Sequence, residues 1–111
     1  MEMINWDDFS KVELRTGTII DVEDFPKARK PAYKLTVDFG KIGIKKSSAQ
    51  ITELYSKEEL VGKQVIGVVN FPVKQIGPFM SECLITGFTN DKDEVVLAVP
   101  DKKVANGIKL G

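Results

Sequence analysis

Histidine is absent from the 111 residues, and cysteine occurs once, as Cys83. The lack of histidine excludes Ser-His and Cys-His nucleophile pairs and every histidine-ligated metal site. A single cysteine allows no internal disulfide, which fits a protein of a reducing compartment. No glycine-rich phosphate loop is present. The sequence therefore predicts no catalytic residue, no metal site and no cofactor, and it favours a binding protein over an enzyme.

Long apolar runs are also missing. None approaches the roughly 20 residues that a membrane-spanning helix needs. Near the N-terminus, Glu2, Asp7 and Asp8 occupy the place where a secretory signal would carry a basic and then an apolar region. We therefore expect a cytoplasmic protein without membrane insertion. The length of the chain suits one domain over residues 1–111.

Net charge is zero overall, with 16 basic and 16 acidic residues, but the charges are unevenly distributed. Residues 1–24 hold two basic and seven acidic residues, a net of −5. Residues 25–46 hold seven basic residues and one acidic residue, a net of +6, and residues 47–111 have a net of −1. The positive field is therefore concentrated in one short stretch.

The first half of the chain carries three strand patterns. Residues 12–25 are rich in β-branched residues, and Gly17 within them suggests a bulge or a sharp bend. Residues 33–39 alternate with period two, so that Tyr33, Leu35, Val37 and Phe39 are expected to face a core. A turn at residues 40–41 leads into a partner strand over residues 42–49, which completes a β-hairpin.

Two short helices are predicted. Asn5 or Asp7 can cap the first, and Trp6 and Phe9 lie three residues apart on one face, where we expect them to plug one end of the core. The second is expected near residues 53–61, with Thr52 or Ser56 as its cap.

Residues 63–71 form a strand whose apolar residues do not alternate, which predicts that both faces are covered, one by the core and the other by a further subunit. Strands over residues 81–88 and 94–99 follow. The order strand, strand, strand, helix, strand, strand predicts an all-β chain. We expect it to fold as a five-stranded OB-fold barrel with a short N-terminal helix and a helix between strands 3 and 4.

Three segments stand out: residues 11–19 (KVELRTGTI), residues 25–35 (FPKARKPAYKL) and residues 70–82 (NFPVKQIGPFMSE). They resemble the tRNA-binding OB-domain family, whose members also occur appended to methionyl- and phenylalanyl-tRNA synthetases. Residues 30–40 and 70–82 are more similar still to free-standing bacterial members that are described as secretion-related chaperones. The resemblance implies an OB-fold homodimer whose terminal segments help to build the interface.

The same resemblance implies two classes of ligand and does not choose between them. One is tRNA or structured RNA. The other is unfolded or export-bound polypeptide, together with the motor protein of the secretion machinery. The tRNA-binding members usually follow the Ser-Glu pair with Gly-Met, whereas this chain has Cys83-Leu84 there.

Candidate RNA-binding residues combine cations for phosphates with side chains that can hydrogen-bond unstacked bases or 2′-hydroxyls. They are Arg29, Lys30, Lys34, Lys45, Lys46, Asn70, Ser81 and Glu82. The alternative for each cation is ordinary solvation, and the alternative for Asn70 is that it satisfies backbone groups in a turn before Pro72. Tyr33, Phe39 and Phe88 are expected in the core. Few aromatics then remain for base stacking, so recognition of RNA shape is favoured over sequence-specific readout.

Candidate peptide-binding residues form a proline-stiffened apolar stretch, in which Met80 adds a flexible contact. They are Phe71, Val73, Ile76, Pro78, Phe79 and Met80. The alternative is that these residues are buried in a dimer interface or under the barrel. The leading hypothesis is a non-enzymatic homodimer that binds tRNA-like RNA. Its rival is an export chaperone that holds polypeptides.

Overall fold

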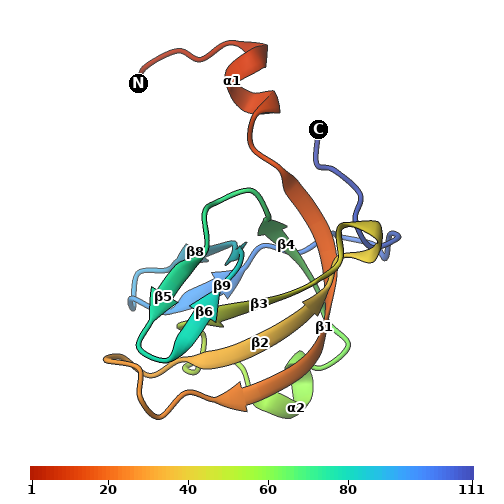
Figure 1. Cartoon of the computed structure of the whole chain (residues 1–111). Helices are drawn as coiled ribbons and strands as arrows, with labels where there is room; N and C mark the ends of the chain where they lie inside the picture. Colours follow the sequence, from red (N-terminus) through yellow and green to blue (C-terminus); the bar gives the residue numbers. More distant parts are fainter.

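Five antiparallel strands form the central sheet of this computed structural model, which describes residues 1–111 (Figure 1). Their spatial order is β3-β2-β1-β4-β7. The strands are β1 (Leu14–Asp24), β2 (Tyr33–Asp38), β3 (Ile44–Ala49), β4 (Gln64–Val68) and β7 (Leu84–Ile85). The long β1 pairs with β2 through one half and with β4 through the other, so it contributes to both sides of the structure.

Hydrogen bonds outside the strand ladders close this sheet into a barrel. The backbone N–H of Glu82 donates to the carbonyl of Lys46 over 2.7 Å, and the N–H of Lys46 donates to the Glu82 carboxylate over 2.9 Å. Beside them, the buried Ser47 hydroxyl donates to the carbonyl of Cys83 over 2.8 Å. These bonds join β3 to the segment that enters β7. The result is the five-stranded barrel of an OB-fold, as predicted.

The helix between β3 and β4 is present and shorter than predicted. It is α2 (Lys57–Leu60), and Ser56 caps it in a reciprocal pair of hydrogen bonds with Glu59. Leu60 is fully buried against the barrel. Gly62 follows with φ +90°, a backbone conformation that favours glycine and turns the chain toward β4. None of the helices has the length and apolar character to cross a membrane.

The N-terminal helix α1 (Trp6–Ser10) is capped by Asn5, one of the two residues expected there, but it does not plug the core. Figure 1 shows α1 standing clear of the barrel. The Trp6 side chain is 73% exposed, and α1 buries no residue. Trp6 and Phe9 do share a face, with ring centroids 5.5 Å apart. The prediction failed because helical spacing shows which residues lie together, not what they pack against.

The core follows the predicted alternation of β2, since Tyr33, Leu35, Val37 and Phe39 are all buried. Gly17 lies against this core rather than in a bulge. A Cβ placed on Gly17 would lie 2.7 Å from the side chains of Phe39 and Val37. The register shift in β1 falls three residues further on, between Ile19 and Asp21. Gly17 therefore makes room for the Phe39 ring. The irregularity in β1 lies elsewhere, between Ile19 and Asp21.

The predicted strand over residues 81–88 is instead broken into three short strands. These are the end of β6 (Phe79–Ser81), then β7, then β8 (Gly87–Thr89). Each has a different partner: β6 pairs with β5 (Lys74–Ile76), β7 with β4, and β8 with β9 (Val95–Leu97). Phe88, expected in the core, is 69% exposed on the β8–β9 hairpin. Changes of partner along a chain leave no signal in hydrophobic alternation.

The chain's own C-terminal segment covers part of the outer face of β4. Ile66 of β4 lines a cavity of about 350 Å³ together with Val104, Ile108 and Leu110. The N–H of Leu110 donates to the carbonyl of Leu14 over 2.8 Å, which fixes the segment along β1. We expected another subunit to cover the outer face of this strand. The C-terminal segment of the same chain supplies part of that cover. The 3₁₀ turn η1 (Gly40–Ile42) connects β2 to β3.

Candidate nucleic-acid interface

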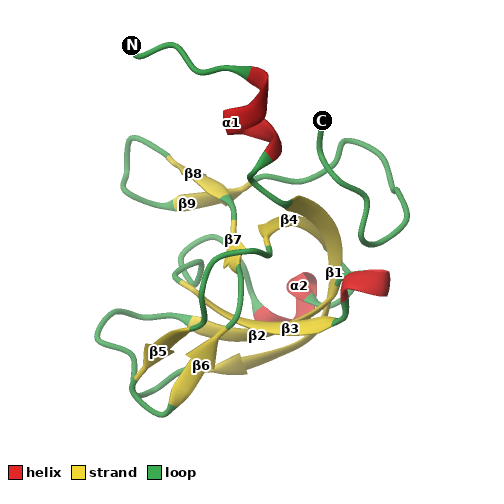
Figure 2. Cartoon of the chain, turned by 45° about the horizontal axis from the view of Figure 1, so that its top comes forward, coloured by secondary structure: helices red, strands yellow, loops and turns green.

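A cleft of about 900 Å³ separates the loop between β1 and β2 from the β5–β6 hairpin. Both elements lie at the same end of the barrel in Figures 1 and 2. We call this space the cationic cleft. Its lining carries no acidic side chain and includes Lys27, Arg29, Lys30, Ser48, Lys74 and Gln75. The fold thus adds Lys74, which is remote in sequence, to the basic stretch of residues 25–46.

The cations of this region have no acidic partner in the chain. The three ion pairs of the structure join Arg15 to Glu13, Lys109 to Glu13 and Lys57 to Asp24. None involves a residue that lines the cationic cleft. Because the charges are exposed and uncompensated, the cleft presents a positive field to solvent and to any approaching anion.

Lys34 lies at the edge of this region, half-buried on β2. Its ammonium group is 5.7 Å from the centre of the Phe25 ring and 6.0 Å from that of Phe79. The two rings themselves pack with centroids 5.4 Å apart. The structure therefore joins a predicted RNA-binding cation to Phe79, a predicted peptide-binding residue. Both rings attract the ammonium group by cation–π interaction, which restrains the Lys34 side chain.

Lys45 and Lys46 were predicted together, but the strand register separates them. Lys46 pairs with Thr36 and lies on the outer face of the sheet with Lys34. Lys45 pairs with Val37, a core residue, so its side chain leaves the opposite face of β3. Only Lys46 shares a face with Lys34.

Asn70 and Glu82 are both engaged in hydrogen bonds within the chain. The Asn70 amide accepts from the N–H of Glu13 over 3.1 Å and donates to the carbonyl of Lys11 over 2.7 Å. It therefore satisfies backbone groups, yet those of the N-terminal segment rather than those of its own turn. Glu82 accepts from the N–H of Lys46 in the bonds that close the barrel. Ser81 is half-buried, and its hydroxyl makes a long bond of 3.4 Å to the carbonyl of Cys83.

The predicted peptide-binding residues do not form one continuous surface. In the β5–β6 hairpin Ile76 pairs with Phe79, and Gln75 pairs with Met80. Cross-strand partners share a face, so Ile76 and Phe79 point to one side while Met80 points to the other. Phe79 packs on Phe25, which identifies its side as the one toward the barrel. Phe71, Val73 and Pro78 are exposed.

A second, more apolar hollow adjoins the cationic cleft. It has a volume of about 320 Å³ and lies between the β5–β6 hairpin and the start of β7. We call it the apolar pocket. Its lining includes Phe71, Pro72, Ile76 and Leu84, with Ser48, Lys74 and Ser81 as polar members and Cys83 at its base. Burial raises the pKa of the Cys83 thiol to about 11, so this cysteine is a small buried group rather than a nucleophile.

Sequence reasoning did not select Lys27, Lys74 or Ser48 as site residues. Lys27 lies within the basic stretch and could have been included on that ground. Lys74 and Ser48 carry no local signal, because they reach the site only when the β5–β6 hairpin folds over β3.

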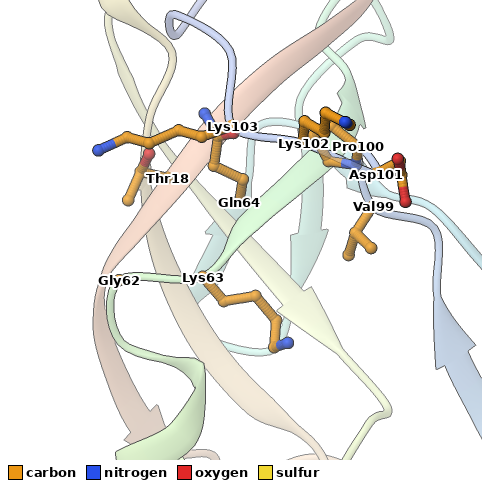
Figure 3. Close-up of a pocket in the computed structure, with 9 residues that line it drawn as sticks. All are labelled: Thr18, Gly62, Lys63, Gln64, Val99, Pro100, Asp101, Lys102 and Lys103. Atoms are coloured by element: carbon orange, nitrogen blue, oxygen red, sulfur yellow. The ribbon is translucent and has the colours of Figure 1, made fainter.

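Another cleft of about 330 Å³ lies beside β4 and the segment after β9 (Figure 3). It contains Lys63, Lys102 and Lys103 together with Asp101. Figure 3 shows the three lysine side chains pointing in different directions rather than toward one point. This cleft therefore offers no converging set of cations, and its acidic residue offsets part of the charge.

Comparison with known proteins places these features in context. The family model described as "Putative tRNA binding domain" matches residues 14–109. The crystal structure of chaperone CsaA from Bacillus anthracis is 44% identical, with a TM-score of 0.93, and the match covers 99% of this chain and 100% of that one. CsaA chaperone protein from Picrophilus torridus is 51% identical, with a TM-score of 0.91, over 98% and 100% of the two chains.

Similarity extends to a synthetase. The methionine–tRNA ligase of Pyrococcus horikoshii is 37% identical over 110 residues, which is 99% of this chain and 15% of that enzyme. The chain thus spans about 15% of the length of the curated relatives that it matches.

Proposed function

The chain belongs to the tRNA-binding domain family, and on this premise we propose that it is a non-enzymatic protein that binds tRNA or similarly structured RNA. The observation that carries the proposal is the cationic cleft, which is free of acidic residues and lies between the β1–β2 loop and the β5–β6 hairpin. OB-folds bind oligonucleotides on strands 2 and 3 and on the loops that flank them. The cleft occupies that region of this barrel.

Phosphate binding at this cleft would draw on cations that are already free. Arg29 and Lys30 are exposed on the loop, and Lys34 is held over two aromatic rings beside it. No ion pair within the chain has to be broken when a phosphate approaches. Release of counterions from the RNA then supplies much of the binding free energy, which makes affinity steeply dependent on salt. Such contacts recognise the shape of the backbone and not its sequence.

We also propose that the functional form is a homodimer. Figure 2 shows α1, the β8–β9 hairpin and the C-terminal segment at one end of the molecule, and each of them carries large apolar side chains that are exposed. Trp6 is 73% exposed, Phe88 69% and Ile108 51%. A second copy would cover these groups by two-fold pairing and would bring two cationic clefts into one assembly. Two linked sites raise avidity for an RNA that reaches both.

A second candidate function is the holding of unfolded, export-bound polypeptides in the cytoplasm, with the secretion motor as a further partner. Two features favour it: the similar structures are CsaA chaperones, and Val73 and Met80 are apolar residues about half exposed on the β5–β6 hairpin. Monomeric proteins rarely leave large apolar patches uncovered without a binding role.

The decisive experiment titrates the protein with bulk tRNA at several salt concentrations between about 50 and 200 mM. The Arg29→Ala/Lys30→Ala/Lys34→Ala variant should lose affinity at low salt. Its plot of log affinity against log salt should be shallower by about 2 to 3, since each lost phosphate contact reduces the slope by roughly one. The matched control is the Lys63→Ala/Lys102→Ala/Lys103→Ala variant, which loses the same charge at the cleft of Figure 3 and should keep the original slope.

Lack of saturable tRNA binding at low salt would exclude the RNA function. An equal loss of tRNA affinity in both triple variants would show that binding depends on overall charge and not on the cationic cleft. For the second function, we expect the protein to slow aggregation of an unfolded client at high salt, and Met80→Asp to abolish the effect. A protein that never slows aggregation is not a chaperone of this kind.

A further inference from the structure

We propose that the apolar pocket receives an unstacked nucleobase of the RNA whose phosphates lie in the cationic cleft. This inference rests on the proposed RNA-binding function and adds to it a preference for unpaired nucleotides. The two hollows adjoin each other, because Ser48, Lys74 and Ile76 line both. A ligand that fills the combined space needs an anionic part and a compact apolar part joined directly. A nucleotide has that composition.

Phe71 supplies a stacking surface in the apolar pocket. Its side chain is 56% exposed, and neither aromatic pair of the structure includes it, since these are Trp6–Phe9 and Phe25–Phe79. One face of the ring is therefore available to a planar partner. Pro72 follows it and limits the backbone freedom of this edge of the pocket. Stacking of a base on an aromatic side chain is tolerant of base identity and stabilises single-stranded nucleic acids.

Polar groups at the rim can engage the edge of a base. No hydrogen bond within the chain occupies the Ser48 hydroxyl or the Lys74 ammonium group, and both lie where the apolar pocket meets the cationic cleft. The Ser81 hydroxyl makes only its long bond to the carbonyl of Cys83. Donors and acceptors placed beside an apolar floor are the usual means of holding an unstacked base.

The charge of the surroundings favours a nucleobase over a polypeptide side chain. The apolar pocket opens onto a cleft with four cations, Lys27, Arg29, Lys30 and Lys74, and with no carboxylate. An unfolded chain of ordinary composition does not match that field, whereas each nucleotide carries one phosphate. The most exposed apolar side chain of β6, Met80, points to the opposite face of the hairpin, away from the pocket.

The test compares two strands with the same phosphates. One is a short single-stranded adenosine RNA, and the other is the same strand with an abasic ribose at every position. We expect the adenosine strand to bind the wild-type protein at least about fivefold more tightly, the lower end of the range for one stacked base. Phe71→Ala should abolish this difference and leave the salt slope unchanged. Met80→Ala removes an exposed apolar side chain from the opposite face of the β5–β6 hairpin, and it should leave the difference between the two strands unchanged.

A spectroscopic readout separates stacking from a merely structural role. Trp6 is the single tryptophan of the chain, so a Trp6→Phe/Phe71→Trp variant carries one indole at the pocket. Its emission should be quenched by the adenosine strand and unaffected by the abasic strand.

The outcomes are distinguishable. Equal binding of both strands with the normal salt slope would overturn the pocket inference and leave the phosphate-binding function intact. Failure of both strands and of bulk tRNA to bind would overturn the two together. Quenching of the double variant by an uncharged apolar peptide, but by neither strand, would assign the pocket to polypeptide side chains and would also overturn the inference.

Discussion

Asn70 binds two residues that are far from it in the sequence, Glu13 at a separation of 57 residues and Lys11 at a separation of 59. Its amide group fits both ends of a short backbone segment, accepting from the N–H of Glu13 and donating to the carbonyl of Lys11. An amide side chain is suited to this task because it offers a donor and an acceptor side by side. At the scale of the residue, Asn70 therefore acts as a clamp on the segment that leads from α1 into β1.

Replacement of Asn70 by alanine should loosen that segment. We expect Asn70→Ala to lower the free energy of unfolding by about 1 to 2 kcal/mol, because two hydrogen bonds are lost. Amide exchange at Glu13 should become faster, and the salt slope for tRNA should stay the same. Asn90→Ala is the control, since Asn90 bonds only within its own turn. Loss of RNA affinity in Asn70→Ala without faster exchange would instead make Asn70 a ligand of RNA.

At the scale of the element, β1 shows how close packing shapes a strand. Its N-terminal half crosses the Phe39 ring at Gly17, and Gly67 of β4 approaches the same ring from the neighbouring strand. A Cβ on either glycine would lie within 2.8 Å of a ring carbon. The two glycines together form the space that a large aromatic side chain fills, which is why β1 and β4 can both pass over it.

A methyl group at Gly17 should therefore overpack the barrel. We expect Gly17→Ala to reduce the free energy of unfolding in urea by about 1 to 3 kcal/mol. Phe39→Leu will destabilise the protein by itself, but the double variant should lose less stability than the sum of the two single variants, since the smaller side chain leaves room for the methyl group. Strictly additive losses would show that Gly17 has some other role.

At the scale of the whole molecule, the two ends of the barrel differ in chemistry. The cationic cleft lies at one end, and exposed apolar side chains of α1, the β8–β9 hairpin and the C-terminal segment lie at the other (Figure 2). This separation allows two copies to associate through their apolar ends while both clefts remain open to solvent.

Charge at the apolar end should therefore dissociate the dimer. We expect sedimentation equilibrium at micromolar concentration to give a dimer mass for the wild-type protein and a monomer mass for Trp6→Glu/Phe88→Asp. Affinity for tRNA should fall in that variant, because the second site is lost. Met80→Asp places a charge on an exposed apolar side chain of the β5–β6 hairpin, at the end that carries the cationic cleft, and this control should remain dimeric. A monomer mass for the wild-type protein would contradict the proposal.

Local patterns in the sequence were sufficient to predict those strands and helices whose formation depends on neighbouring residues. The alternation of β2 predicted its buried face, and each helix start had two candidate caps in the sequence, of which the structure uses Asn5 and Ser56. The basic stretch located one wall of the cationic cleft, and the quoted segments pointed to the family.

The tertiary structure alone decided the rest. It broke the predicted strand over residues 81–88 among three partners, exposed Trp6 and Phe88, and folded the β5–β6 hairpin so that Lys74 and Ser48 complete the site. The physical reason is the range of the interactions involved. Periodicity and capping act over a few residues. Other features depend on segments that meet only in the folded chain: which strands pair, which side of the β5–β6 hairpin meets the barrel, and how the Phe39 ring fits against Gly17 and Gly67.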